Sequence, residues 1–258
     1  MPYAIVLFYS VLLSSLSVVF AGAAELPDTV KQIRSSIVAV GTYQKTRRPP
    51  ADFRGTGFAV GNGNYIMTNA HVLPKTLNTT KNETLVVFVG HGKDVEARPA
   101  QIVAMDVEHD LALLRMNGIA LPFMRLGNSQ HVREGQSVAF TGFPIGTVLG
   151  LYPATHRGII AAITPIAIPA GSSQQLDPAL IQRLRNPYDV FQLDATAYPG
   201  NSGSPLYDPS TGWVLGVINM VFVKGTKENA LSQPSGITYA IPGQYVQALL
   251  KQAGIAPR

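Results

Sequence analysis

The chain has 258 residues, of which 46% are hydrophobic, with 24 glycines and no cysteine. This composition excludes a disordered chain and predicts a core built without disulfides, in one large β-rich domain or in two small barrels. The formal net charge of +5 comes from dispersed lysines and arginines rather than from one block, so we expect no nucleic acid or other polyanion as a partner.

The first segment of the chain is apolar. Residues 4–20 carry no charge and are followed by Ala21-Gly22-Ala23, a small-residue pattern typical of a signal-peptidase site. We therefore predict a signal peptide over residues 1–24 and an exported protein, periplasmic or secreted. Because no lysine or arginine precedes the apolar stretch, an uncleaved N-terminal anchor is the alternative. Only in that case do we expect contact with a membrane.

Short strand-like runs and turns begin after this segment. Residues 27–34 have helical spacing, and the β-branched run 36–43 predicts a first strand. Residues 44–54 are rich in proline and arginine and predict a loop. Residues 55–60 and 65–69 then flank a Gly-Asn-Gly-Asn sequence that is typical of a β-hairpin turn.

The remaining elements continue this pattern. Gly55-Thr56-Gly57 matches no phosphate-binding motif and indicates a β-bulge or close packing. Further strands are predicted at residues 84–90, 95–104, 111–116, 137–143, 155–163, 190–194, 213–223 and 236–241. Short, evenly spaced strands predict a barrel or a sandwich. The long helix that we expect lies at residues 243–253, and residues 169–186 predict a long loop of a length that often carries function.

Three polar residues stand out along this series of strands. Ser202 lies between Gly200 and Gly203 with Asn201 before it, His71 follows the run 65–69, and Asp110 opens the next run. A serine hydroxyl becomes a nucleophile when a base takes its proton and amides hold the resulting oxyanion. Taken singly, such residues are more often turn, surface or capping residues. Their order along the chain, however, is one that serine peptidases use.

Longer stretches around these residues carry a family resemblance. GTGFAVGNGNYIMTNAHVL, HDLALLRM and ATAYPGNSGSPLYD resemble the catalytic blocks of trypsin-like serine peptidases, and most closely the protease domain of bacterial HtrA (Deg) proteins. The resemblance implies an all-β, chymotrypsin-like peptidase domain over residues 25–254. Its two six-stranded antiparallel β-barrels would span about residues 36–128 and 129–242, with a C-terminal helix at 243–253. We expect no PDZ domain, since so few residues follow that helix.

The resemblance also implies a mechanism. Ser202 would attack a peptide carbonyl, His71 would carry the proton, Asp110 would orient the imidazole, and an acyl-enzyme would form. The amides of Gly200, Asn201 and Ser202 are the expected oxyanion hole. We expect no cofactor and no metal, because the sequence has no HExxH motif and no cysteine cluster.

The resemblance places the substrate-binding walls on either side of the serine. They are expected at Thr196, Ala197, Tyr198, Ile218, Asn219 and Met220. Thr196 stands where family members that select Lys or Arg carry an acid, and a buried cation without a partner is costly. We therefore expect protein or peptide substrates cleaved after small or medium apolar residues. The alternative is a proteolytically silent trypsin-fold protein that acts as a binding or chaperone module; the oligomeric state stays open.

Overall fold

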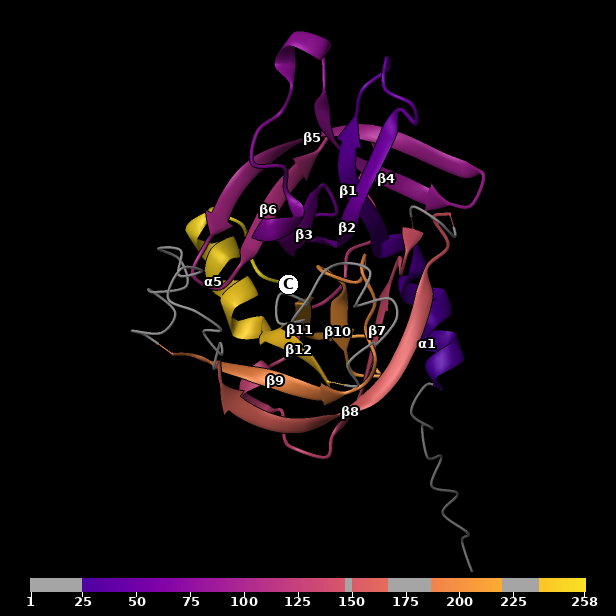
Figure 1. Ribbon diagram of the computed structural model, residues 1–258. Coiled ribbons are helices and arrows are strands. Elements are labelled where there is room, and N and C mark those ends of the chain that lie inside the picture. Colours follow the sequence, from indigo (N-terminus) through magenta and orange to yellow (C-terminus); the bar gives the residue numbers. More distant parts are fainter. Residues whose placement is uncertain (1–24, 147–149, 167–186, 220–236) are drawn as a thin grey trace, which may run out of the picture.

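The computed structural model describes residues 25–146, 150–166, 187–219 and 237–258. Its strands form two closed antiparallel barrels of six strands each, one above the other in Figure 1. The expected all-β, chymotrypsin-like architecture is therefore confirmed.

The first barrel is built from consecutive strands in the order β1-β2-β3-β6-β5-β4, with β1 also pairing with β4. The strands are β1 (Ile37–Tyr43), β2 (Ala51–Val60), β3 (Tyr65–Asn69), β4 (Thr84–His91), β5 (Asp94–Asp106) and β6 (Leu111–Met116). The expected hairpin between β2 and β3 is present, with Val60 opposite Tyr65.

The second barrel repeats this topology. Its circular order is β7-β8-β9-β12-β11-β10, with β10 pairing back onto β7. The strands are β7 (Ser137–Gly142), β8 (Ala154–Pro165), β9 (Asp189–Asp194), β10 (Pro205–Tyr207), β11 (Val214–Asn219) and β12 (Ile237–Pro242). The short strand β10 was not among the expected runs, because three residues carry no readable alternation.

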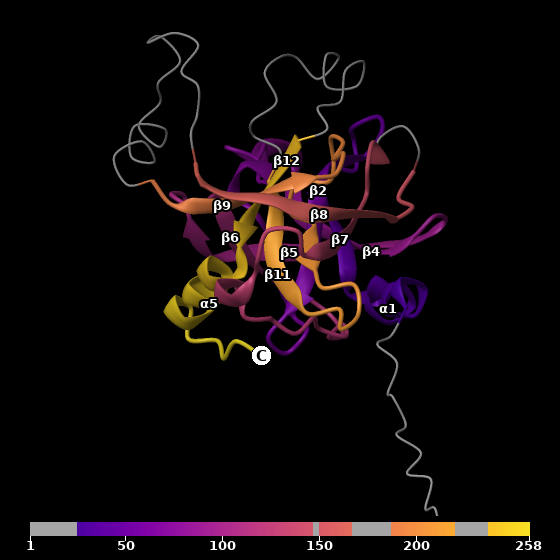
Figure 2. The ribbon, with the colours of Figure 1, turned by 90° about the horizontal axis from the view of Figure 1, so that it is seen from below.

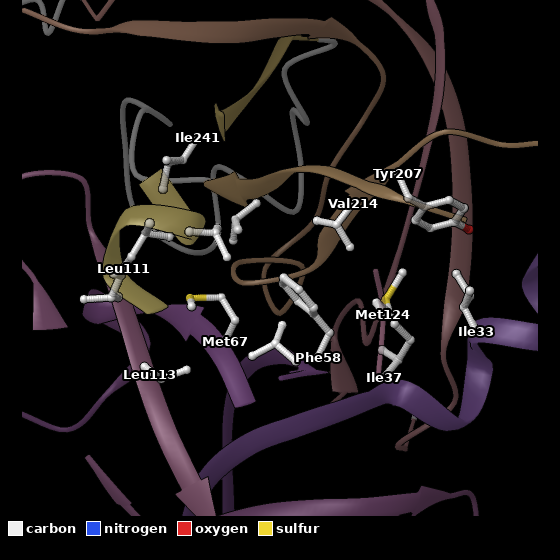
Figure 3. Close-up of a cluster of buried hydrophobic side chains, with 14 of the residues drawn as sticks. Ile33, Ile37, Phe58, Met67, Leu111, Leu113, Met124, Tyr207, Val214 and Ile241 are labelled. Atoms are coloured by element: carbon white, nitrogen blue, oxygen red, sulfur yellow. The ribbon is translucent and has the colours of Figure 1, made fainter. Parts of the chain in front are cut away.

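The largest apolar cluster joins the two barrels. Figure 3 shows Phe58 and Met67 of the first barrel packed with Val214 and Ile241 of the second, and all four side chains are at most 1% exposed. Burying a large apolar side chain contributes about 1.5–3 kcal/mol. This shared cluster therefore holds one barrel against the other, which fixes the loops where the barrels meet.

Helices lie at the two sides of the barrels. Helix α1 (Leu26–Ile33) and helix α5 (Gly243–Gln252) are on opposite sides of the molecule (Figures 1 and 2). α5 buries Val246, Leu249 and Leu250 against the barrels. Short 3₁₀ turns are η1 (Arg34–Ser36), η2 (Ala70–Val72), η3 (Thr79–Lys81) and η4 (Ser129–His131).

Strand β2 begins at Ala51, so the loop expected over 44–54 is wrong for residues 51–54. Gly41 of β1 lies opposite Phe53, and a Cβ on Gly41 would lie 2.0 Å from the Asp52 carbonyl oxygen. Only glycine permits this close approach of the two strands. Because residues 44–54 are rich in proline and arginine, their composition did not indicate that a strand begins at Ala51.

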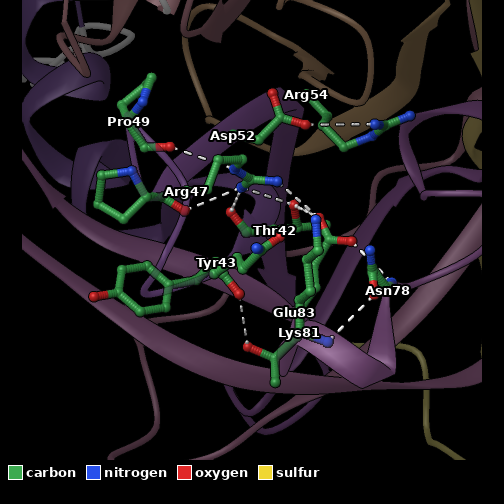
Figure 4. A network of polar contacts seen from close by, with 12 residues as sticks. Thr42, Tyr43, Arg47, Pro49, Asp52, Arg54, Asn78, Lys81 and Glu83 are labelled. Carbon is green, nitrogen blue, oxygen red and sulfur yellow. Dashed lines mark hydrogen bonds and ion pairs between the residues drawn. The ribbon is translucent and has the colours of Figure 1, made fainter.

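Arg47 closes the shorter turn that remains. Its guanidinium donates to the Thr42 and Pro50 carbonyl oxygens at 3.0 Å and to Glu83 Oε1 at 2.8 Å. Figure 4 shows Arg47 at the centre of this network. The arginine therefore supports the turn and also ties it to the segment before β4.

Three expectations fall outside the described residues. These are the signal or anchor segment at 1–24, the loop at 169–186 and the strand residues 220–223. Within the four described ranges, no helix is long and apolar enough to cross a membrane.

Candidate active site

His71 and Asp110 come from the ends of neighbouring strands. Asn69, the last residue of β3, pairs with Leu111, the first residue of β6, so the residues just beyond this pair lie close together. His71 lies in η2, and Asp110 directly precedes β6. The Ala70 amide and the Asn69 side chain both donate to the Asp110 carbonyl oxygen, at 3.0 and 3.1 Å.

The side chains of His71 and Asp110 form a close pair. His71 Nδ1 lies 2.6 Å from Asp110 Oδ2, and the His71 amide donates to Asp110 Oδ1 at 2.9 Å. The Asp110 side chain is 5% exposed and that of His71 is 36% exposed. Because a carboxylate accepts at Nδ1, that nitrogen carries the hydrogen, and Nε2 is left to accept a proton.

A residue of the second barrel completes the surroundings of Asp110. Asn219, the last residue of β11, donates from Nδ2 to Asp110 Oδ2 at 2.9 Å. Asp110 itself has φ +55°, a left-handed conformation that is uncommon for a residue other than glycine. The family resemblance implies a place for Asn219 in a substrate-binding wall; in the structure its side chain reaches the carboxylate and links the two barrels.

Ser202 lies in the loop between β9 and β10 and is 7% exposed. Gly200 and Gly203 have φ values of +101° and +86°, which favour glycine. A Cβ on Gly203 would lie 2.1 Å from the Thr56 carbonyl oxygen. The Ser202 carbonyl accepts from the Thr56 amide at 2.8 Å, so the loop is bound to β2 of the first barrel.

The loops that carry His71 and Ser202 both pack against Gly55 of β2. A Cβ on Gly55 would lie 2.6 Å from Val72 Cγ2 and 2.9 Å from the Ser202 carbonyl oxygen. Since Val72 follows His71 directly, both loops pack where β2 has no side chain. The close packing expected for the Gly55-Thr56-Gly57 run is thereby confirmed.

A hydrogen bond from a neighbouring loop orients the peptide before Gly200. The Pro199 carbonyl accepts from the Ile145 amide at 2.7 Å. In a trans peptide the N–H points away from the C=O, so the Gly200 amide is directed away from Ile145. Ile145 has φ +50°, an outlier for a β-branched residue and the kind of strain that clusters at functional sites.

The amides around Ser202 are not all equivalent. The Asn201 amide donates to the Tyr198 carbonyl oxygen at 2.9 Å. Within the described part of the chain, the amides of Gly200 and Ser202 have no acceptor. Of the three expected oxyanion donors, Gly200 and Ser202 are therefore available to a ligand.

The expected substrate-binding residues are only partly described. Ala197 is buried, and its amide donates to Thr238 Oγ1 at 3.1 Å, while Thr196 and Tyr198 are half-buried. Ile218 is buried, and its carbonyl accepts from the Gly203 amide at 2.9 Å. Met220 lies outside the described residues.

Two other histidines, His109 and His156, have structural neighbours. His109 Nδ1 lies 2.6 Å from Asp106 Oδ2, and its ring stacks on Tyr245 with centroids 3.8 Å apart. His156 stacks on Phe140, and burial lowers the pKa of its imidazole. Among the residues that the structure places, no group of His, Asp or Glu could hold a metal ion.

Comparison with known proteins assigns the family. A family model described as a trypsin-like peptidase domain matches residues 55–217. The chain belongs to the trypsin-like peptidase family. This trypsin-like peptidase is 31% identical over 192 residues to a probable periplasmic serine endoprotease, DegP-like, of Halomonas elongata, a match that covers 73% of the chain and 32% of the relative.

A second curated relative agrees with this assignment, and a solved structure agrees with the fold. The trypsin-like peptidase is 33% identical over 208 residues to the mitochondrial serine protease HTRA2 of Drosophila persimilis, covering 80% of the chain and 40% of the relative. It superimposes on the HtrA-type protease AlgW with decapeptide with a TM-score of 0.64 and 23% identity, over 89% of the chain and 67% of that structure. The peptidase matches less than half the length of the two curated relatives, and its identity of 31% and 33% to them confirms the resemblance to HtrA proteins.

Sequence reasoning missed two contributors to the site. It did not place Thr56, which contacts the Ser202 loop from the other barrel, and it did not foresee that Asn219 donates to Asp110. For Thr56 the only available signal was its place between two glycines, and this signal indicated packing alone.

Proposed function

We propose that this trypsin-like peptidase is a serine endopeptidase that hydrolyses proteins, with Ser202 as nucleophile and a His71–Asp110 pair as its base. The observation that carries the proposal is the 2.6 Å contact of His71 Nδ1 with buried Asp110, in a loop that packs with the Ser202 loop against Gly55. The names of the relatives, a serine endoprotease and a serine protease, support the same chemistry.

The reaction proceeds in two halves. Ser202 Oγ attacks the peptide carbonyl while His71 Nε2 takes its proton and then donates it to the leaving amine. In the second half the same nitrogen takes a proton from water, the resulting hydroxide attacks the acyl carbonyl, the bond to Ser202 Oγ breaks with release of the acid, and His71 Nε2 returns the proton to Ser202 Oγ. Asp110 keeps Nδ1 protonated and offsets the charge of the imidazolium that forms in each half.

The Gly200 and Ser202 amides hold the oxyanion. Their hydrogens are without acceptors in the described residues, and the Ile145 amide keeps the Pro199 carbonyl turned aside. One such donor contributes about 10²–10³ in turnover. The conformation of this loop is therefore as important for turnover as the side chains of Ser202, His71 and Asp110.

The substrate side chain before the cleaved bond is small or medium and apolar. Thr196 supplies no charge, and Ala197, at 6% exposure, is a buried apolar neighbour. Cleavage of a random peptide library should therefore enrich Val, Ala or Ile at this position. A dominant Arg, Lys or Glu would contradict this assignment of specificity.

The protein acts after export. The apolar segment at 4–20 with its small-residue site supports a signal peptide, and the DegP-like relative is named as periplasmic. Protein beginning near residue 25 should be recovered from a periplasmic or secreted fraction. Full-length protein in the membrane fraction would instead favour the uncleaved anchor.

Hydrolysis of fluorescently labelled casein tests the proposed activity. The mature protein should cleave casein, and Ser202→Ala should abolish cleavage. Ser204→Ala is the matched control, since Ser204 is a buried serine two positions away whose hydroxyl has no partner within the described residues. A folded wild-type protein without activity would favour the binding or chaperone module.

A further inference from the structure

Thr56 occupies the point where the two barrels meet beside Ser202. It belongs to β2 and is fully buried. Its hydroxyl donates to the Gly200 carbonyl oxygen at 2.7 Å, across 144 residues of sequence, and accepts from the Phe143 amide at 3.0 Å. Because an amide can only donate, the hydroxyl hydrogen is committed to Gly200.

The backbone of Thr56 contacts the same loop. Its amide donates to the Ser202 carbonyl oxygen at 2.8 Å, and its own carbonyl accepts from Thr68 Oγ1 at 2.7 Å. One residue of the first barrel therefore holds the carbonyls of Gly200 and Ser202, the two residues whose amides have no acceptor among the described residues.

The contact with Phe143 extends this support. Phe143 precedes the turn that contains Ile145, whose amide holds the Pro199 carbonyl. The Phe143 carbonyl in turn lies 2.3 Å from the position of a Cβ on Gly200. The Thr56 hydroxyl thus joins the loop that carries Gly200 to the segment that orients its preceding peptide.

We propose that the Thr56 hydroxyl is a positioning group that holds the 199–203 loop with the Gly200 and Ser202 amides directed at the oxyanion. Gly200 has no side chain to restrict its backbone torsions. A hydrogen bond to its carbonyl oxygen is therefore needed to hold its backbone in one conformation. The inference rests on the proposed peptidase function. Thr56 itself contacts no reacting atom and acts through Gly200.

Three variants separate this role from simple packing. Thr56→Val keeps the shape and removes the hydroxyl, Thr56→Ala also removes the hydroxyl with less steric demand, and Thr56→Ser restores it. Thr42→Val is the matched control. Thr42 is 1% exposed on β1 of the same barrel, and its hydroxyl also donates once, to Glu83 at 2.7 Å, and accepts once, from Arg47 at 3.1 Å.

The kinetic readouts are casein hydrolysis and the rate of phosphonylation by a fluorophosphonate, whose phosphoryl oxygen occupies the oxyanion position. An oxyanion donor that is misdirected lowers the rate less than a donor that is absent. We therefore expect Thr56→Val and Thr56→Ala to lower kcat and the phosphonylation rate by about 10–100-fold. KM should change by less than about threefold, since a transition-state contact is lost. Thr56→Ser should recover at least a third of the wild-type rate.

The outcomes that overturn the inference are distinct from failure of the proposed function. Wild-type rates in folded Thr56→Val or Thr56→Ala, equal losses in Thr42→Val, or no recovery in Thr56→Ser would each overturn it. If the wild type itself is unreactive, the proposed function fails, and ¹⁵N spectra of the Gly200 amide decide the inference. A Gly200 shift in Thr56→Val that Thr56→Ser reverses supports the positioning role, and an unmoved signal refutes it.

Discussion

Single side chains at the boundary between the barrels determine how the site is held. Asp110 is buried, and its carboxylate accepts from His71 and from Asn219, which lies 109 residues further along the chain. A hydrogen bond to a charged group contributes about 1.5–3 kcal/mol, and an orphaned partner costs more. The orientation of the imidazole therefore depends on a residue of the opposite barrel.

Asn219→Ala tests this dependence. Among the described residues, the variant leaves His71 as the one partner of Asp110 Oδ2. We therefore expect kcat/KM for casein to fall by about 10-fold, the equivalent of about 1.4 kcal/mol. Asn78→Ala is the control, because the Asn78 side chain caps η3 and bonds Lys81 and Thr80, outside the proposed site. Equal activity of Asn219→Ala and wild type would show that the cross-barrel bond does not orient the carboxylate.

Ser204 provides a prediction for stability. Its hydroxyl is fully buried and has no hydrogen-bond partner in the described residues. A buried unsatisfied hydroxyl costs about 1–3 kcal/mol, so Ser204→Ala should raise the free energy of unfolding by about 1 kcal/mol. Urea denaturation measures this difference. If Ser204→Ala instead lowers the free energy of unfolding, the Ser204 hydroxyl has a hydrogen-bond partner in solution.

At the scale of elements, the turn between β1 and β2 is held by charge. Glu83 accepts from the Asn78 amide, the Thr42 hydroxyl and the Arg47 guanidinium (Figure 4). These donors, the Asn78 amide first, outweigh the opposing effect of burial and lower the pKa of Glu83 below its ordinary value of 4.5. The ionised form of Glu83 is therefore favoured in the folded state.

The pH dependence of stability follows from this direction. A carboxylate with a lowered folded-state pKa contributes stability above its unfolded pKa, and the contribution is lost as pH falls through the folded pKa. Glu83→Gln should lower the free energy of unfolding at pH 7 by about 1–2 kcal/mol. Thermal melts should show the gap to wild type closing below about pH 4.5. A gap that stays constant from pH 7 to pH 3 would contradict the role of the charge.

The elements also show how far the sequence reaches. Strands such as β3 and β6 were predictable because apolar runs end at turn residues, and the hairpin at Gly61 needed only its turn chemistry. β10 is too short to show a pattern, and the start of β2 is fixed by the approach of Asp52 to Gly41. Strand pairing of this kind depends on tertiary contacts that a short stretch of sequence does not contain.

For the whole molecule, two barrels of the same topology share one apolar cluster, and the proposed site lies across their boundary. The barrels and their family were predictable from three sequence blocks. The contacts across the boundary were not, because Thr56 with Gly200 and Asp110 with Asn219 are each more than 100 residues apart. Such contacts form only when both barrels are closed and packed together, so no local sequence pattern predicts them.

The proposed peptidase function depends on Ser202 being a nucleophile that His71 activates. Mass-spectrometric mapping of the adduct formed by a biotinylated fluorophosphonate tests it most directly, because the probe reacts with activated serines without requiring the natural substrate. We expect a single modified peptide with the added mass on Ser202, and loss of this modification in His71→Ala. An unmodified Ser202 in folded wild-type protein, or equal modification in His71→Ala, would contradict activation of Ser202 by His71.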